Sequence, residues 1–377
     1  MSGPEIFIST GEVSGDQHAA ALLNELRRLR PDLSAWGVGG PRLAAAGQNQ
    51  LAGIDQLSLV GITEVLPRLR SILALLRRLG RELAQRRPAI VLLVDAPDFN
   101  LRLAKAAHAL GLRVVYFITP QVWAWRRGRL GDIRRTVDLA LCILPFEETF
   151  FREAGVRAAY IGHPLVDLVR PSAPSQALRA GLGLDPARPV IALLPGSRRG
   201  EVRALLPPLL GAARLLSRRT PRPQFVVPAA SPALRPLLSP LTEEPVAARI
   251  VEGRAWDCLA AADAAVVASG TATLETAIIG TPFVTVYRVS PLSHAIARRL
   301  IHARWASLPN LLLGEPAVCE LLQNDCRPET IAAEIERLLD NPEAAVLLKE
   351  KCGKVRALLG PGGAAARAAA AVLAEIP

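Results

Sequence analysis

Two segments of this chain share one pattern: an apolar run typical of a β-strand, a short loop of small residues, and then the start of a helix. The first is Ile191-Ala-Leu-Leu-Pro-Gly-Ser-Arg198 and the second is Ala268-Ser-Gly-Thr-Ala-Thr-Leu-Glu275. In such a turn, backbone N–H groups and the positive end of the helix dipole face the same point. Two loops of this kind can hold one diphosphate. The pair therefore indicates an α/β architecture with an anion site.

The side chains of these loops favour a nucleotide-sugar ligand. Arg198 adds a fixed charge whose fork geometry suits phosphate oxygens. Glu275 would sit one turn into the second helix, where a carboxylate can accept from the two hydroxyls of a ribose. The alternative is that both are the ordinary Gly-rich turns of any α/β protein. The predicted residues of this nucleotide-sugar site are Gly196, Ser197, Ser269, Gly270, Thr271, Thr273 and Glu275, and Arg198 is predicted to be catalytic.

Strand-like runs alternate with amphipathic helical stretches along the chain, which predicts an α/β fold of doubly wound parallel sheets. A chain of 377 residues is too long for one ordinary core, so we expect two domains. The Pro- and Ser-rich residues 168–175 predict a linker between a domain of residues 1–168 and a domain of residues 169–377. The predicted strands are residues 5–9, 34–38, 90–94, 113–118, 139–143, 159–161, 190–194, 224–227, 249–251, 264–268 and 283–287.

The same fold class predicts where ligands bind. In doubly wound sheets they lie beyond the carboxyl ends of the strands, so we expect a substrate cleft between the two facing domains. The Ala-rich residues 363–376 predict a packed terminal helix that can return to the first domain.

The composition narrows the class of partner. The formal net charge of +11 predicts a phosphate-bearing partner, which can be a nucleotide, a nucleic acid or an anionic membrane. The five cysteines have no CxxC spacing, so we expect free thiols in a reducing compartment. The N-terminus lacks the regions of a signal peptide, and no apolar run is long enough to span a membrane. We therefore expect a cytoplasmic protein.

Residues 66–87 predict a helix with an unusual charge. Apolar residues recur on one face, while the rest of the segment carries seven arginines and the single acid Glu82. A surface helix facing the core would have the same stripe, and this alternative stays open. Excess positive charge beside an apolar stripe is also typical of a helix on an anionic membrane surface. The predicted membrane-facing residues are Val65, Leu66, Leu69, Ile72, Leu73 and Leu76.

Two loops in the first half carry carboxylates at predicted strand ends. Residues 10–16 follow the first strand, and their glycines permit a tight turn before a helix capped by Asp16. Residues 95–100 follow another strand, where a carboxylate is well placed as a general base. We favour Asp95 over Asp98 as the base, because Asp98 is expected to be a helix N-cap. The predicted substrate-binding residues are Gly11, Glu12, Ser14, Asp16 and Asp98, and Asp95 is predicted to be catalytic.

Residues 119–129 combine two tryptophans with three arginines. Such a loop can stack the bases of single-stranded nucleic acid, or bind the face of a sugar together with its phosphate. His163 ends another predicted strand, and a lone histidine there is more often structural. No cluster of His, Cys and Asp has metal-ligand spacing, so we predict neither a metal nor a cofactor.

Eight motifs, taken in order, resemble the lipid A disaccharide synthase family over nearly the whole chain. They are GEVSGD (11–16), GITEVL (61–66), DAPDFN (95–100), VWAWR (122–126), GHPL (162–165), LLPGSR (193–198), SGTATLE (269–275) and SLPN (307–310). The resemblance implies the two-domain GT-B fold of an inverting, metal-free glycosyltransferase. By the same resemblance, Asp95 matches the proposed base, and Arg198, Glu275 and Asn310 match donor-site positions.

The resemblance also implies the substrates. A 2,3-diacylglucosamine would pass from UDP to 2,3-diacylglucosamine 1-phosphate, forming the β-1,6-linked disaccharide 1-phosphate at the inner face of the bacterial inner membrane. We expect peripheral membrane association and no nucleic-acid partner, and an oligomer is compatible with the sequence. One alternative is a GT-B-fold UDP-sugar epimerase, which would not need a basic membrane patch. The other is a basic single-strand nucleic-acid-binding protein, which would not need Glu275 behind two phosphate loops.

Overall fold

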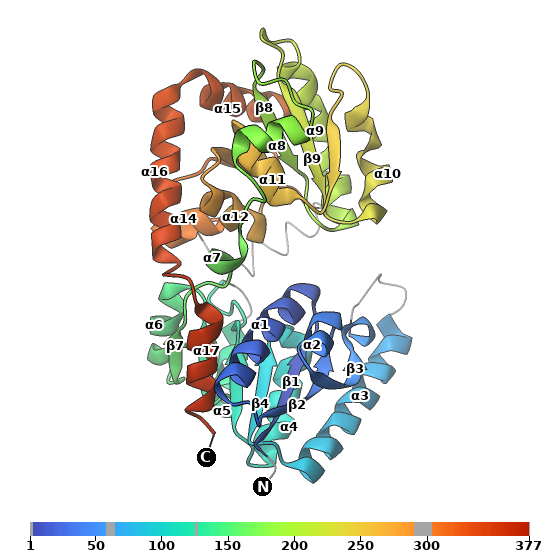
Figure 1. The fold of residues 1–377 in the computed structure, drawn as a ribbon, viewed down its shortest axis with the longest axis vertical. Helices are drawn as coiled ribbons and strands as arrows, with labels where there is room; N and C mark the ends of the chain where they lie inside the picture. Colours follow the sequence, from blue (N-terminus) through green and yellow to red (C-terminus); the bar gives the residue numbers. More distant parts are fainter. Residues whose placement is uncertain (1–2, 58–64, 125–126, 290–303, 377) are drawn as a thin grey trace. The chain divides into compact units, whose positions relative to one another are not determined.

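The computed structural model describes residues 3–57, 65–124, 127–289 and 304–376, and it contains two compact units (Figure 1). The first unit comprises residues 1–164 and 361–377, and the second comprises residues 165–360. Each unit contains one parallel β-sheet flanked by helices. The α/β fold class predicted from the alternating sequence pattern is therefore confirmed.

The sheet of the first unit has the strand order β3-β2-β1-β4-β5-β6-β7. The strands are β1 (Glu5–Thr10), β2 (Ser34–Gly39), β3 (Gln48–Gly53), β4 (Ile90–Val94), β5 (Val114–Phe117), β6 (Leu139–Cys142) and β7 (Ala158–Tyr160). The helices are α1 (Val13–Leu29), α2 (Pro41–Ala45), α3 (Val65–Arg86), α4 (Pro97–Ala109), α5 (Leu130–Thr136), α6 (Pro145–Glu153) and α17 (Ala364–Leu373), with 3-10 turns η1 (Ile54–Gln56) and η3 (Arg127–Arg129).

The sheet of the second unit has the strand order β10-β9-β8-β11-β12-β13. The strands are β8 (Val190–Leu194), β9 (Gln224–Ala229), β10 (Arg249–Glu252), β11 (Ala264–Ala268), β12 (Phe283–Tyr287) and β13 (Glu320–Leu322). The helices are α7 (Leu165–Leu168), α8 (Ser175–Gly181), α9 (Arg199–Leu216), α10 (Arg235–Leu238), α11 (Ala255–Ala261), α12 (Thr271–Ile279), α14 (Leu308–Leu313), α15 (Pro328–Asp340) and α16 (Pro342–Leu358), with 3-10 turns η4 (Pro232–Leu234) and η5 (Ser239–Thr242).

The strand order gives both units an equivalent ligand-binding position. In each sheet the order of the chain reverses between two central strands, β1 and β4 in the first unit and β8 and β11 in the second. Parallel pairing aligns Thr10 with Val94 and Leu194 with Val267. The loops after these paired strands therefore open side by side. Ligands of doubly wound sheets bind at such switch points.

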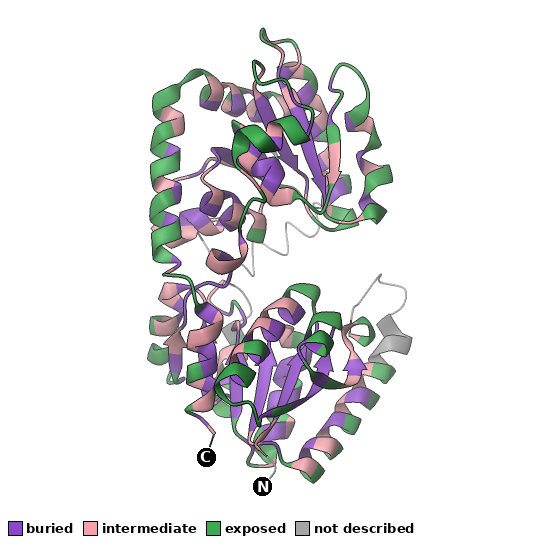
Figure 2. Cartoon of the chain, in the orientation of Figure 1, coloured by how far each residue is buried: buried purple, intermediate pink, exposed green. Residues whose placement is uncertain are grey.

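Both faces of the first sheet are buried (Figure 2). Phe7 of β1 and Val91 of β4 contribute to one hydrophobic cluster, and Ile6 and Ile90 contribute to the cluster on the other face. Because successive side chains of a strand point to opposite faces, a strand in this position must be apolar throughout. This burial explains the continuous apolar runs in the sequence.

The C-terminal helix α17 returns to the first unit and packs against α1 (Figure 1). Ala368 and Ala369 are fully buried in the cluster that contains Ile6. Small alanine side chains allow two helices to approach closely. The end of the chain is also held by an ion pair, in which Arg157 Nη2 lies 2.8 Å from Glu375 Oε1.

The apolar stripe of α3 is partly a core face. Leu79 and Leu83 are fully buried, and Ile72 and Leu76 pack half-buried against the same cluster. Leu73 is half-buried and is not part of that cluster. No helix among the described residues is long and apolar enough to cross a membrane.

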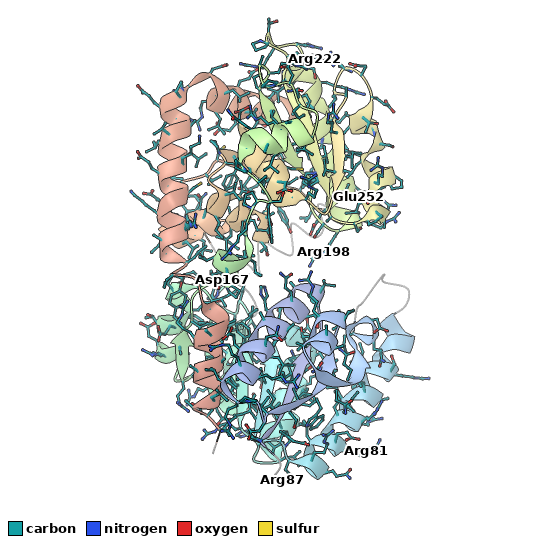
Figure 3. All side chains as sticks on the ribbon, in the orientation of Figure 1. Arg81, Arg87, Asp167, Arg198, Arg222 and Glu252 are labelled. Atoms are coloured by element: carbon teal, nitrogen blue, oxygen red, sulfur yellow. The ribbon has the colours of Figure 1, made fainter. Side chains whose placement is uncertain are left out.

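The charged side of α3 is exposed. Arg77, Arg78, Arg81 and the following Arg87 are exposed. Figure 3 shows Arg81 and Arg87 at the surface of the first unit. The side chains of Val65, Leu66 and Leu69 lie outside the described residues. The membrane role of the six predicted residues therefore stays a prediction.

Two short strands differ from the sequence expectation, because β3 and β13 were not predicted. β3 is polar, yet its glutamines satisfy backbone carbonyls: Gln48 Nε2 donates to Ile8 O at 2.9 Å and Gln50 Nε2 donates to Gly40 O at 2.6 Å. β13 has only three residues. Neither segment has the apolar alternation that identifies a strand in a sequence.

Candidate functional site

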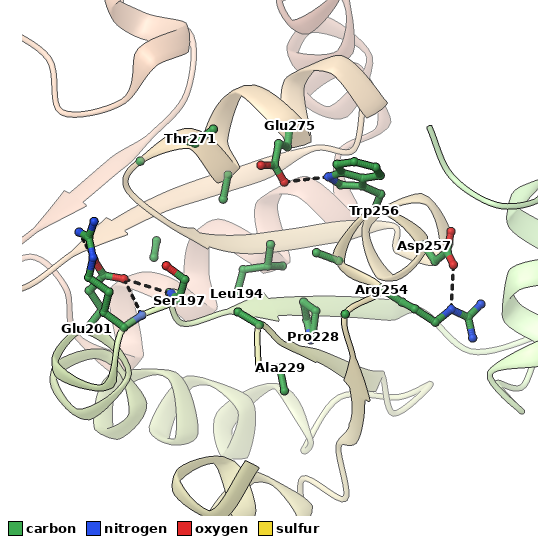
Figure 4. Close-up of a pocket in the computed structure, with 18 of the residues that line it drawn as sticks. Leu194, Ser197, Glu201, Pro228, Ala229, Arg254, Trp256, Asp257, Thr271 and Glu275 are labelled. Carbon is green, nitrogen blue, oxygen red and sulfur yellow. Dashed lines mark hydrogen bonds and ion pairs between the residues drawn. The ribbon is translucent and has the colours of Figure 1, made fainter. Parts of the chain in front are cut away.

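A cavity of about 670 Å³ lies in the second unit at the carboxyl ends of β8, β9, β10 and β11 (Figure 4). Both loops singled out in the sequence line it. The lining includes the predicted residues Gly196, Ser197, Arg198, Ser269, Gly270, Thr271 and Glu275. The cavity also includes residues that sequence reasoning missed, among them Arg170, Ser172, Glu201, Arg254, Trp256 and Asp257.

The loop after β8 is built to hold an anion. Gly196 has a φ of +107°, and a Cβ at this position would lie 2.6 Å from Glu201 Oε2, so only glycine fits. The N–H groups of Ser197 and Arg198 donate to Glu201 Oε2 at 3.1 and 3.2 Å. Arg198 Nη1 donates to the other oxygen, Oε1, at 3.3 Å. A carboxylate thus occupies the donor cluster at the start of α9, where a phosphate oxygen would find the same partners.

The second loop leads to a carboxylate held by an indole. Glu275 lies in α12, and Trp256 lies in α11; both line the cavity. Trp256 Nε1–H donates to Glu275 Oε2 at 2.9 Å. Burial raises the pKa of the Glu275 carboxyl, and the hydrogen bond from Trp256 opposes that shift.

One wall of the cavity comes from the segment predicted as a linker. The Ser172 N–H and Oγ–H donate to the Asp257 carboxylate at 2.7 and 2.8 Å. Arg254 Nε donates to Asp257 Oδ2 at 2.8 Å. Burial alone would raise the pKa of Asp257, but the hydrogen bonds from Ser172 and Arg254 hold it below its usual value. The linker segment is therefore tied to α11.

Two predicted donor-binding residues are not among those that line the cavity. Thr273 Oγ1 donates to Gly270 O at 2.7 Å within the first turn of α12. Asn310 is fully buried, accepts from Val318 N at 2.7 Å and donates to Glu320 Oε1 at 2.8 Å. Both side chains shape local loops, and a direct binding role for them stays a prediction.

In the first unit, Asp95 follows β4 in a strained conformation. Asp95 and Ala96 have φ angles of 51° and 46°, the left-handed region that non-glycine residues seldom adopt. Asn100 Nδ2 donates to Asp95 O at 2.8 Å, and Tyr116 Oη donates to the same carbonyl at 2.7 Å. Ser9 Oγ–H donates to Asn100 Oδ1 at 2.8 Å and so orients the Asn100 amide. These buried contacts hold the turn in place.

The same position perturbs the acidity of Asp95. Burial, together with the nearby charge of Glu12, raises the pKa of Asp95 to about 6. A carboxyl with a pKa near the working pH suits a general base. Gly11 is buried, and a Cβ there would lie 2.7 Å from Ala96 Cβ. Glu12 and Ser14 are exposed. The loops after β1 and β4 are therefore in contact.

Asp98 also differs from its predicted local role. Ala96 occupies the N-cap position, and Asp98 lies in the first turn of α4. Its carboxylate is exposed and pairs with Arg129. The expectation that Asp98 is an N-cap was wrong because α4 begins at Pro97.

Asp16 caps a different helix from the one expected. α1 already begins at Val13, so Asp16 lies inside its first turn. The Asp16 carboxylate accepts from the N–H groups of Gly40, Arg42 and Leu43 at 2.7, 3.0 and 3.2 Å. It therefore caps α2, which begins 25 residues later at Pro41.

The Trp-Arg segment contributes a second indole–carboxylate pair. Trp123 Nε1–H donates to Glu147 Oε1 at 3.0 Å, and its ring packs edge-on against Phe146 at 4.9 Å. Burial raises the pKa of Glu147 to about 7. Trp125 and Arg126 lie outside the described residues.

His163 is buried near His18. Burial, reinforced by the charge of His18, lowers the pKa of His163 to about 3, so this imidazole is neutral at physiological pH.

The family model and the curated relatives agree on one family. Residues 6–374 match the family described as lipid-A-disaccharide synthetase. The chain is 48% identical over 371 residues to the lipid-A-disaccharide synthase of Anaeromyxobacter dehalogenans, covering 98% of this chain and 97% of that protein. It is also 48% identical over 375 residues to the Myxococcus xanthus enzyme of the same name, covering 99% and 98%.

Solved structures resemble the fold at low sequence identity. The Neisseria meningitidis UDP-GlcNAc 2-epimerase bound to UDP-GlcNAc has a TM-score of 0.64 at 13% identity, covering 98% of this chain and 99% of that chain. The calicheamicin glycosyltransferase CalG4 has a TM-score of 0.61 at 18% identity, covering 100% and 98%. The two parallel sheets thus define a protein of the GT-B class. Within that class, the chain belongs to the lipid-A-disaccharide synthetase family, whose members are glycosyltransferases.

The raised pKa of Asp95 predicts that Asp95→Asn is more stable than the wild type. In the unfolded chain the pKa of Asp95 returns to about 3.8, so ionisation of this carboxyl favours unfolding. A neutral side chain should therefore raise the free energy of unfolding by about 1–3 kcal/mol at pH 7. Asparagine also tolerates the left-handed conformation. The gain should shrink as pH falls from about 6 to about 4, because the folded wild type then becomes protonated. Urea unfolding of both proteins between pH 4 and pH 7 measures this difference in stability. An Asp95→Asn variant that is no more stable than the wild type at pH 7 would contradict the prediction.

Proposed function

We propose that this chain transfers 2,3-diacylglucosamine from UDP to the 6-hydroxyl of 2,3-diacylglucosamine 1-phosphate, with inversion, as a lipid-A-disaccharide synthase. The observation that carries the proposal is the cavity of the second unit, where two phosphate-type loops and Glu275 meet at the switch point of the sheet. Family membership supports this activity over an epimerase and over a nucleic-acid-binding protein.

In the proposed complex, UDP occupies the cavity of the second unit. Its diphosphate accepts from the N–H groups of Ser197 and Arg198, in place of the Glu201 carboxylate that accepts both hydrogen bonds in the structure. The Arg198 guanidinium and the start of α12 meet the negative charge that grows on the leaving diphosphate. Glu275 accepts hydrogen bonds from the ribose hydroxyls.

Asp95 of the first unit is the proposed general base. Its carboxylate takes the proton from the acceptor's 6-hydroxyl as that oxygen attacks the anomeric carbon on the face opposite UDP. The pKa of about 6 supports Asp95 over Asp98, because Asp98 is exposed and paired with Arg129. Glu12 and Ser14, exposed beside Gly11, are the proposed contacts for sugar hydroxyls.

Asp95→Asn should lower kcat by about 10²- to 10⁴-fold at pH 7.5, the usual contribution of a general base. In the wild type, kcat/KM should rise with pH through about 6, because the base must be ionised. Asp98→Asn is the matched control and should retain most of the rate. A fully active Asp95→Asn variant, or an inactive Asp98→Asn variant, would transfer the role to Asp98.

Arg198→Ala should weaken UDP binding by about ten- to a hundredfold, because a hydrogen bond to a charged group contributes roughly 1.5–3 kcal/mol. Calorimetric titration with UDP measures the effect. Arg199→Ala is the control, since Arg199 is also exposed and is not among the residues that line the cavity. Equal UDP affinity of wild type and Arg198→Ala would mean that the β8 loop is only a turn.

The basic helix α3 is the proposed attachment point to the inner membrane. Each arginine near an anionic surface contributes on the order of 1 kcal/mol, and Arg77, Arg78 and Arg81 are exposed. Leu66 and Leu69 precede the half-buried Leu73 by seven and four residues, a helical spacing. Leu73 is outside the core cluster that buries Leu79. Attachment would be peripheral and would hold the enzyme beside its acylated substrates.

Replacing Leu66, Leu69 and Leu73 together with Ser should release the protein from vesicles containing phosphatidylglycerol without lowering its melting temperature much. Leu79→Ala is the opposite control: it should keep vesicle binding but lose about 2–5 kcal/mol of stability, since Leu79 is fully buried. Co-sedimentation with vesicles measures membrane binding, and thermal melts measure stability. A triple variant that still binds vesicles as the wild type does would remove α3 from the proposal.

A further inference from the structure

Trp256 and Glu275 form a pair of which only Glu275 belongs to a family motif, SGTATLE (269–275). Trp256 lies in the first turn of α11, after β10, and Glu275 lies one turn into α12, after β11. Both side chains line the cavity, and Figure 4 shows the indole N–H directed at the carboxylate. The Nε1–Oε2 distance is 2.9 Å. The two helices are therefore joined across the wall of the cavity by one charge-assisted hydrogen bond.

This hydrogen bond fixes one of the two carboxylate oxygens. A glutamate has a long side chain with several rotatable bonds, so an unrestrained carboxylate would lose conformational entropy when it engages a ligand. Oε2 is held by the indole, while Oε1 accepts no hydrogen bond from the described part of the chain. Oε1 is thus a preoriented acceptor in the wall of the cavity, and its natural partner is a hydroxyl donor.

We propose that Trp256 is a positioning residue that orients Glu275 toward a ribose hydroxyl and thereby sets the preference of the cavity for a ribonucleoside diphosphate over its 2′-deoxy analogue. The inference rests on the proposed binding of UDP in this cavity. A hydrogen-bonding site discriminates strongly against a ligand that lacks the hydroxyl, because the buried acceptor is then left unpaired. Trp256 acts through Glu275.

The chain offers a matched control for the chemical change. Trp123 also donates its indole N–H to a buried glutamate, Glu147, at 3.0 Å. This pair lies in the first unit and not in the lining of the cavity. Phenylalanine at either position removes one N–H and keeps an aromatic ring, so the two variants differ only in where the pair lies.

The experiment measures dissociation constants of UDP and 2′-deoxy-UDP by calorimetry. Trp256→Phe should weaken UDP about three- to tenfold, the worth of roughly one hydrogen bond, and should change 2′-deoxy-UDP less than about twofold. The preference for ribose should therefore fall. Glu275→Ala should abolish the preference, and Trp123→Phe should leave both constants unchanged. Trp256→Leu also lacks a donor, has the same expectation as Trp256→Phe, and serves if the Phe variant does not fold.

The outcomes separate the inference from the proposed function. If wild-type protein binds neither nucleotide, the proposed function fails. If the wild type prefers UDP and the Trp256 variants keep that preference, the positioning role is wrong while the proposed function stands. Equal weakening of both nucleotides would mean that Trp256 contributes packing only, and it would also overturn the inference.

Discussion

Within each sheet every strand runs parallel to its neighbours, so all strands end at one edge and all loops toward the following helices begin there. This constraint determines where chemistry can occur. At the switch points, β1 with β4 and β8 with β11 open paired loops whose backbone N–H groups and side chains converge. Asp95 follows β4 in one unit and Arg198 follows β8 in the other, so each lies beside the switch point of its own sheet.

At the carboxyl-end edge of its sheet, the second unit presents positive and N–H groups, whereas the first unit presents a carboxylate. The loop after β8 concentrates N–H donors and a guanidinium, and the Glu201 carboxylate accepts hydrogen bonds from them. The loop after β4 presents a carboxylate in a left-handed turn, held by Asn100 and Tyr116. Burial of that carboxylate raises its pKa and costs stability. Such a cost is typical of residues at functional sites and fits the proposed role of Asp95 as a base.

Sequence reasoning recovered the parts of the site that carry strong local signals. The fold class, the two glycine-bearing loops of the cavity and the strand-end position of Asp95 all follow from apolar runs that stop at small or acidic residues. Trp256, Ser172 and Asp257 were missed, because each acquires its role from a partner distant in sequence. Asp16 was assigned to the wrong helix for the same reason: its three donors lie 24 to 27 residues away.

The central claim is that the chain joins two acylated glucosamines, and a product analysis tests it most directly. Purified protein would be mixed with UDP-2,3-diacylglucosamine and 2,3-diacylglucosamine 1-phosphate, and the products separated and examined by mass spectrometry and NMR. The account predicts equal amounts of UDP and a β-1,6-linked disaccharide 1-phosphate. An epimerised UDP-sugar, or UDP released without any disaccharide, would contradict it.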